Sequence, residues 1–322
     1  MTVDLIDNTK PGIVLVTGAW HTPVHFEVLR LALEAQGYET YVPRLPTLGS
    51  TGLTWKDDAM AIQKAVVKRM DEGKEFIIAA HSYGGIPGCG ATKGFTAHDR
   101  AAAGKKGGFK AILFIAAFAI PEPNLDLLTA FGGTFPAWMA HDIPYTGNAS
   151  SFVHPTAHYA FYSDVPKEDA DRYFELLERQ SQDAYEFPVD CVPSNCGIPH
   201  TFLVCENDQA MLLPFQEMLI AKIPTFKVER CSAGHSPFIT QPHRVIEVLS
   251  QIDSDGTPNH RVQAYCSTDE EASLTPIVES MAAGITGCIY PTAGAQHAGD
   301  EATHHRHRSI EGESGEVNGN IT

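Results

Sequence analysis

Short apolar runs alternate with helical patterns along most of the chain. Apolar, β-branched runs between turn residues predict buried strands, and apolar residues three or four positions apart predict amphipathic helices. The predicted strands are Ile13–Val16, Glu39–Val42, Phe76–Ala80, Ala111–Ala117, Thr201–Cys205 and Phe226–Cys231. The predicted helices are Phe26–Gln36, Asp57 to about Gly73, Gly84 onward, Leu213–Ile223 and Arg244–Ile252. This alternation predicts an α/β fold with a mostly parallel sheet, helices on both faces, and an active site beyond the carboxyl ends of the strands.

The alternation is interrupted once, between about residues 121 and 198. Helical patterning covers Lys167–Gln182 in this stretch. A long apolar insertion at the carboxyl edge of a sheet predicts a helical lid that shapes a pocket. Its aromatic residues can line that pocket or pack the insertion's own core, and we expect both, with only a few facing the pocket. They are Phe131, Phe135, Trp138, Tyr145, Phe152, Tyr159, Phe161, Tyr162, Tyr173 and Phe174.

The last fifth of the chain differs in composition. From Ser254 to Thr322 there are ten Asp and Glu against three Arg and no Lys, in Ser- and Gly-rich sequence. We therefore expect one domain over residues 1–253 and an acidic, low-complexity, poorly ordered tail over 254–322. Within the tail, Leu274–Ile289 is apolar enough for a docked helix. The histidines at 304–307 lack acid or thiol ligands at zinc-site spacing, so no metal is expected.

Charge and composition exclude several functional classes. The formal net charge of −16 argues against non-specific binding to nucleic acid or anionic lipid, since both need clustered Lys and Arg. The first ten residues do not resemble a secretory signal, and no run approaches the ~18 apolar residues of a membrane span. Seven scattered cysteines do not resemble a disulfide framework, so we expect a cytoplasmic setting. The expected partner is a small-molecule substrate, and both monomer and homodimer stay open.

The sharpest chemical signal is a serine between small residues, in the segment AAHSYGG at 79–85. A tight strand-to-helix turn lifts a serine hydroxyl clear of the sheet and strains the backbone. Residues two positions away must then be small, and here they are Ala80 and Gly84. The pattern is a relaxed G-x-S-x-G nucleophile elbow around Ser82, because Ala80 replaces the first glycine. Such patterns also arise by chance in turns, so the rest of the chain must decide.

A serine nucleophile needs a base, and the base needs an orienting acid. In a fold of this order the acid follows a late strand and the histidine follows the last one. Asp208 comes just after the strand predicted at 201–205, and His235 just after the last predicted strand. Its position distinguishes His235 among the fifteen histidines. Glu206 lies closer to the strand end and is the rival acid.

The negative oxygen formed by nucleophilic attack needs fixed donors, and backbone N–H groups serve. One is expected from Tyr83, directly after the serine, and the other from Ala19 in the loop after the first strand. Trp20, His21 and Trp138 are possible substrate contacts, and His21 equally suits holding its loop by hydrogen bonds. The glycines at 84–94 depart from the dinucleotide fingerprint, and no phosphate-binding G-x-x-x-x-G-K-[ST] occurs, so no cofactor is expected.

With these residues assembled, the chain resembles an α/β-hydrolase, and within that superfamily the compact group of plant methylesterases and hydroxynitrile lyases. The likeness covers about residues 11–253 and rests on VLVTGAWH (14–21), LEAQGY (33–38), HSYGG (81–85), CEND (205–208) and GHSP (234–237). It implies a reduced sheet of about six strands and a serine hydrolase of carboxylesterase type. Such an enzyme would cleave a small apolar ester, thioester or lactone through an acyl-enzyme, with Ser82, His235 and Asp208 as its triad.

Departures from the family pattern bear on the reaction. Thr17 stands where family members usually have histidine, which changes a side chain that supports the oxyanion loop. Ser236 stands where hydroxynitrile lyases of this group have lysine, so cyanohydrin cleavage is disfavoured. Two alternatives stay open from the sequence: a cofactor-free lyase or cyclase using the same triad, and a small-ligand-binding protein with a vestigial site.

Overall fold

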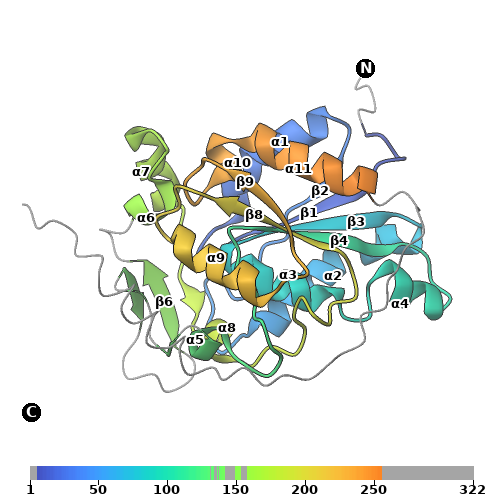
Figure 1. Cartoon of the computed structure of the whole chain (residues 1–322), viewed down its shortest axis with the longest axis horizontal. Helices are drawn as coiled ribbons and strands as arrows, with labels where there is room; N and C mark the ends of the chain where they lie inside the picture. The colour runs from blue at the N-terminus through green and yellow to red at the C-terminus, as the bar shows by residue number, and fades with distance from the viewer. Residues whose placement is uncertain are drawn as a thin grey trace, which may run out of the picture.

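A six-stranded parallel sheet forms the centre of the molecule (Figure 1). The structure is a computed structural model that describes residues 6–130, 132–133, 136, 138–141, 149–153 and 158–255. The strand order is β2-β1-β3-β4-β8-β9, and every neighbouring pair is parallel. The predicted α/β fold and its six strands are confirmed. The strands are β1 (Gly12–Val16), β2 (Glu39–Tyr41), β3 (Glu75–His81), β4 (Gly108–Ile115), β8 (His200–Cys205) and β9 (Lys227–Cys231).

The inner strands are buried on both faces, which explains their continuous apolar sequences. In β1, Ile13 and Leu15 belong to the core on one face, whereas Val14 and Val16 belong to the core on the other. Figure 1 shows α1 and α11 over one face and α2, α3 and α9 over the opposite face. The helices of this layer structure are η1 (Pro23–Phe26), α1 (Glu27–Ala35), α2 (Trp55–Asp71), η2 (Ser82–Gly84), α3 (Gly85–Thr92), α4 (Ala97–Ala102), α9 (Leu213–Lys222), α10 (Pro237–Thr240) and α11 (Pro242–Asp255).

Helix α2 shows how local sequence sets the element boundaries. Thr54 caps it in a capping box with Asp57, so the helix begins two residues before the predicted start at Asp57. Ile62, Val66 and Met70 are fully buried at helical spacing. This inner face packs α2 against α3, the helix that follows Ser82.

The insertion between β4 and β8 contains the helices predicted for a lid and, in addition, a second sheet that was not predicted from the sequence. Its strands are antiparallel, in the order β5-β6-β7. The helix predicted over 167–182 ends at Glu175, and Gln180 pairs with β6 instead, because its buried side chain bonds to residues of the main domain. The elements are α5 (Leu127–Ala130), β5 (Met139–His141), β6 (Ser150–Val153), α6 (His158–Tyr162), α7 (Lys167–Glu175), β7 (Gln180–Ser181) and α8 (Asp183–Glu186).

The aromatic residues of the insertion differ in their surroundings. Phe161 and Tyr162 are buried in the core, whereas Tyr159 is half-exposed. Phe131, Phe135 and Tyr145 lie outside the described residues.

Helix α11 continues to Asp255, slightly beyond the predicted domain boundary. The predicted tail, with its apolar stretch and histidine cluster, otherwise lies outside the described residues. Within the described ranges, no helix has the length and apolar character needed to cross a membrane.

Candidate active site

Ser82 occupies a sharp turn between β3 and the helices that follow it. Its φ of 50° lies in the left-handed region, a strained conformation for a residue with a side chain. A Cβ on Gly84 would lie 2.6 Å from the carbonyl oxygen of Thr17 and 2.7 Å from that of Val16. The turn therefore packs directly onto the end of β1, and Gly84 permits this approach. The geometry is that of a nucleophile elbow.

His235 and Asp208 lie together in the loops after β9 and β8. His235 Nδ1 is 2.7 Å from Asp208 Oδ2, and both residues are buried. The other carboxylate oxygen accepts hydrogen bonds from the N–H groups of Ala210, at 2.7 Å, and Met211, at 2.8 Å. These amides fix the carboxylate, which can orient the imidazole. Glu206 instead lies 3.7 Å from Arg230 Nη1 with its side chain exposed, so the structure brings Asp208 to the histidine.

A second histidine supports the His235 loop from the elbow. His81 Nε2 donates to the carbonyl oxygen of His235 over 2.8 Å, and the two rings lie 4.5 Å apart between centroids. Burial lowers the pKa of His81 well below its ordinary value, so the ring is neutral near pH 7. The residue before the serine thus ties the elbow to the loop of His235. The prediction missed this contact, although His81 stands inside the quoted motif.

His21 holds its own loop, one of the two roles expected for it. Its Nδ1 donates to the carbonyl oxygen of Ala19 over 2.7 Å, and its Nε2 accepts from the Tyr162 hydroxyl over 3.0 Å. Burial lowers the pKa of His21 well below its ordinary value, which fits this neutral tautomer. His21 therefore joins the loop after β1 to the lid helix α6.

The loop after β1 brings backbone donors to the elbow. Trp20 has a φ of 63°, and its N–H donates to Gln180 Oε1 over 2.8 Å. The Ala19 N–H has no acceptor among the described residues. A Cβ on Gly18 would lie 2.8 Å from His81 Nδ1, so glycine allows this loop to reach the elbow. The Tyr83 N–H lies in the first turn of η2, where helix geometry leaves amides unpaired.

Aromatic side chains from the loop and the insertion gather beside His235. Trp20 lies 5.9 Å from both Trp138 and Phe161, measured between ring centroids, and Trp138 lies 5.2 Å from Phe161. Phe161 in turn lies 5.6 Å from the ring of His235. The surroundings of the imidazole are therefore apolar on this side. The fold brings Trp138 here from a position more than fifty residues away in sequence from each of the triad candidates.

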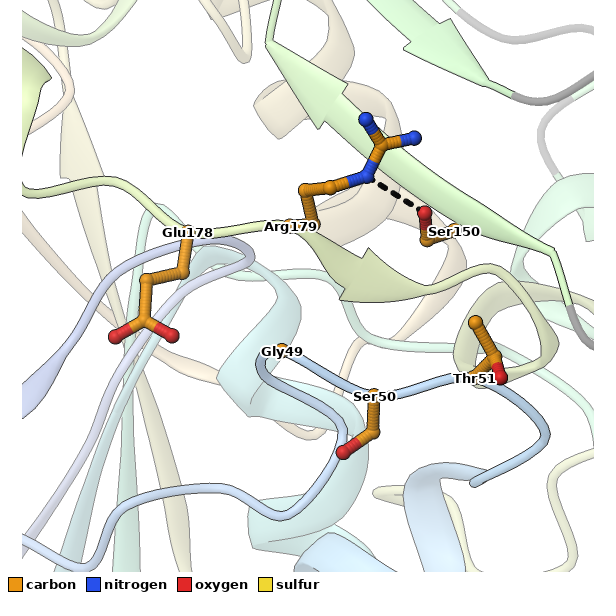
Figure 2. Close-up of a pocket in the computed structure, with 6 residues that line it drawn as sticks. All are labelled: Gly49, Ser50, Thr51, Ser150, Glu178 and Arg179. Atoms are coloured by element: carbon orange, nitrogen blue, oxygen red, sulfur yellow. Dashed lines mark hydrogen bonds between the residues drawn. The ribbon is translucent and has the colours of Figure 1, made fainter.

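A surface hollow of about 580 Å³ lies beside the loop at 49–51, and Figure 2 shows its lining. Arg179 Nε donates to Ser150 Oγ there over 2.7 Å. The hollow is open and contains none of the predicted triad residues. Its lining residues are Gly49, Ser50, Thr51, Ser150, Glu178 and Arg179.

Within the described ranges, no group of three or more His, Cys, Asp or Glu side chains is arranged to hold a metal ion. The cysteines described there are free and buried. Cys205 and Cys231 end β8 and β9 with their sulfurs 3.6 Å apart, next to the loops of Asp208 and His235.

Comparison with known proteins agrees with the fold. A model of the alpha/beta hydrolase family matches residues 13–248. The chain belongs to the alpha/beta hydrolase family. The predicted family resemblance is therefore confirmed.

Relatives of this alpha/beta hydrolase match it over most of their length. The alpha/beta hydrolase nvfD of Aspergillus novofumigatus is 27% identical over 243 residues, which cover 74% of this chain and 95% of that protein. The crystal structure of polyneuridine aldehyde esterase has a TM-score of 0.60 at 18% identity, covering 76% of this chain and 99% of that one. Tomato methylketone synthase I, complexed with 2-tridecanone, has a TM-score of 0.60 at 16% identity, covering 77% and 99%.

Proposed function

We propose that this alpha/beta hydrolase is a cofactor-free serine esterase, with Ser82 as nucleophile, His235 as general base and Asp208 as the acid that orients His235. The 2.7 Å contact between His235 and Asp208, in a loop that His81 ties to the strained turn of Ser82, is the observation that carries this assignment. With Asp208 bonded to Nδ1, the opposite ring nitrogen Nε2 is left for proton transfer.

In the acylation step, Ser82 Oγ attacks the carbonyl carbon of the ester while His235 Nε2 takes the hydroxyl proton. The carbonyl oxygen becomes negative and accepts hydrogen bonds from the N–H groups of Ala19 and Tyr83. Collapse of this intermediate breaks the bond to the alcohol oxygen, which leaves with the proton from Nε2. Preorganised amides stabilise the developing charge because they need no reorientation during the reaction.

In the deacylation step, water attacks the acyl carbon and gives a proton to His235 Nε2. The second intermediate collapses, the bond between the acyl carbon and Ser82 Oγ breaks, and the serine takes the proton back. The products are a carboxylic acid and the free enzyme, so each turnover consumes one water.

The chemistry around His235 favours an apolar substrate. Trp20, Trp138 and Phe161 form an aromatic cluster beside the imidazole. We propose a small, largely apolar ester, thioester or lactone, because such a compound gains from burial against aromatic rings and needs few polar partners.

A fluorophosphonate probe tests the nucleophile directly. It should label the wild-type protein at Ser82, and Ser82→Ala should abolish labelling while leaving the circular dichroism spectrum unchanged. The wild type should also hydrolyse small carboxylic esters, whereas Ser82→Ala should not. Failure of the folded wild type to label or to hydrolyse any ester would count decisively against a serine esterase.

Isotope labelling distinguishes hydrolysis from lyase or cyclase chemistry at the same residues. In water enriched in ¹⁸O, an esterase places one ¹⁸O atom in each carboxylic acid product. Product formation that depends on Ser82 but incorporates no ¹⁸O would instead indicate an elimination or cyclisation.

A further inference from the structure

A buried carboxylate outside the triad lies behind the oxyanion loop. Asp58, in the first part of α2, is completely buried, and its hydrogen-bond donors within the described residues, from Thr47 and Tyr83, are all uncharged. Burial raises its pKa to about 7. A carboxylate is costly to bury without a cation, so its hydrogen-bond donors show what holds it there.

Tyr83 supplies one of those donors. Its hydroxyl donates to Asp58 Oδ2 over 2.8 Å, and its ring is fully buried. Tyr83 directly follows Ser82, so its main chain lies at the elbow while its side chain ends on the carboxylate. The residue that would supply one oxyanion N–H is therefore anchored at both ends.

Thr47 links the carboxylate to the lid. Its N–H donates to Asp58 Oδ1 over 3.0 Å and its hydroxyl donates to Oδ2 over 2.7 Å. Having given its only hydroxyl proton to Asp58, Thr47 accepts a hydrogen bond from Gln180 Nε2 over 3.0 Å. This fixes the orientation of the Gln180 amide, whose Oε1 then faces the loop after β1.

Gln180 completes the connection to the second oxyanion loop. Its Oε1 accepts from the Trp20 N–H over 2.8 Å, and the nearby Glu178 N–H donates to the Trp20 carbonyl oxygen over 2.9 Å. Both backbone groups of Trp20 are thus held by one lid segment while its φ stays at 63°. Because Trp20 directly follows Ala19, this contact fixes the Ala19–Trp20 peptide, which adjoins the Gly18–Ala19 peptide that carries the other oxyanion N–H.

All donors in this network point one way, from Trp20 through Gln180 and Thr47 to Asp58, and from Tyr83 to the same carboxylate. A carboxylate accepts every one of these bonds, whereas an amide at position 58 would present N–H groups to some of the donors. The network therefore matches a group at its end that accepts every bond, and aspartate supplies it in its ionised form, which prevails above its pKa of about 7.

We propose that Asp58 is a positioning residue that holds both oxyanion-hole amides in place, that of Tyr83 directly and that of Ala19 through Thr47, Gln180 and Trp20. The catalytic consequence rests on the proposed esterase function. The geometric part, that Asp58 fixes the two loops, stands independently of any reaction.

Amide hydrogen exchange tests the geometric part without a substrate. In Asp58→Asn, exchange should become at least about tenfold faster in peptides covering 17–21 and 83–86 than in wild type. If Asp58→Asn does not fold, Tyr83→Phe serves as the test instead. It removes only one hydroxyl and should accelerate exchange in the 83–86 peptide. Tyr38→Phe is the matched control, because Tyr38 is also buried and loses a hydrogen bond to Ser250, far from this network.

Kinetics tests the catalytic part with an ester and its thionoester, in which sulfur replaces the carbonyl oxygen. Asp58→Asn should lower kcat for the ester about 10- to 100-fold with KM changed less than about threefold, since loss of one oxyanion donor costs about 100- to 1,000-fold. The ester-to-thionoester rate ratio should fall as well, because sulfur depends less on well-placed N–H donors. A purely structural role would not change that ratio.

The outcomes separate the two proposals. Faster exchange together with lower kcat and a smaller rate ratio, absent in Tyr38→Phe, supports the positioning role. Unchanged exchange in both loops, or faster exchange with unchanged kcat, overturns it. If the wild type neither labels nor hydrolyses any ester, the esterase function fails, and the exchange comparison still decides whether Asp58 holds the loops.

Discussion

Replacing Asp58 by asparagine should change how the free energy of unfolding depends on pH. The substitution keeps the size of the side chain and removes a group that titrates in the buried network. Burial raises the pKa of Asp58 from 3.8 to about 7 in the folded protein. In the unfolded chain the same carboxyl loses its proton near pH 4.

The sign follows from which state binds more protons. Between about pH 4 and pH 7 the folded wild type keeps a proton that the unfolded chain has lost, so its stability falls as pH rises. At about 1.4 kcal/mol per pKa unit, the shift amounts to about 4 kcal/mol once pH exceeds 7. Asp58→Asn has no such loss. The stability of the variant minus that of wild type should therefore rise from pH 4 to 7 and then level off.

Urea denaturation at half-unit steps between pH 5 and pH 8.5 measures this difference. Within that window we expect the difference to rise by about 2 kcal/mol up to pH 7. The other titrating groups are the same in both proteins and cancel to first order. Tyr38→Phe is the control, whose offset from wild type should stay constant. A difference curve for Asp58→Asn that is flat to within about 1 kcal/mol would refute the raised pKa.

Three further outcomes are expected. Asp208→Asn should lower kcat for ester hydrolysis about 10⁴-fold, while Glu206→Gln should stay within about threefold; equal losses in steady-state assays would contradict the choice of acid. Gly84→Ala, whose Cβ would meet the main-chain oxygens of Thr17 at 2.6 Å and Val16 at 2.7 Å, should lower the free energy of unfolding by about 1–3 kcal/mol in urea denaturation and slow probe labelling. In the Asp58→Asn background, the free energy of unfolding should decrease as the pH is lowered from about 6.5, by up to ~1.4 kcal/mol per pH unit for each buried neutral histidine, because the unfolded chain takes up the protons. A free energy of unfolding that stays constant below about pH 6.5 would argue against the lowered pKa of His21, His25 and His81.

The inner strands of the sheet were predictable because they are buried on both faces. β1 and the middle of β3, from Phe76 to Ala80, are apolar without interruption, so a run of hydrophobic residues is enough to locate these strands. The lid was harder to predict. Its strands β5, β6 and β7 are two to four residues long, and their pairing depends on contacts distant in sequence, such as that of Gln180 with Trp20.

The candidate catalytic residues were predictable because each lies in a turn or loop that follows a strand. The buried residues that support the two oxyanion loops were harder to predict. Asp57 and Asp58 both lie at the start of the helix predicted from Asp57, but only Asp57 takes part in the capping box. Asp58 precedes Ile62 and Val66 at four-residue spacing, which places it on the buried stripe of α2. That spacing was a usable signal for a buried carboxylate. Its partners Thr47 and Gln180 carry no comparable pattern, because tertiary structure alone brings them together.

The strand order has a consequence for the synthesis of this protein. β1 and β3, which lead into the loops of Ala19 and Ser82, lie in the middle of the sheet and leave the ribosome early. β9 is an edge strand, and the loop that follows it carries His235. A nascent chain can therefore assemble the elbow before its base exists. We expect esterase activity to begin only when β9 docks onto the edge, so ribosome-bound chains that end before it should be inert toward esters.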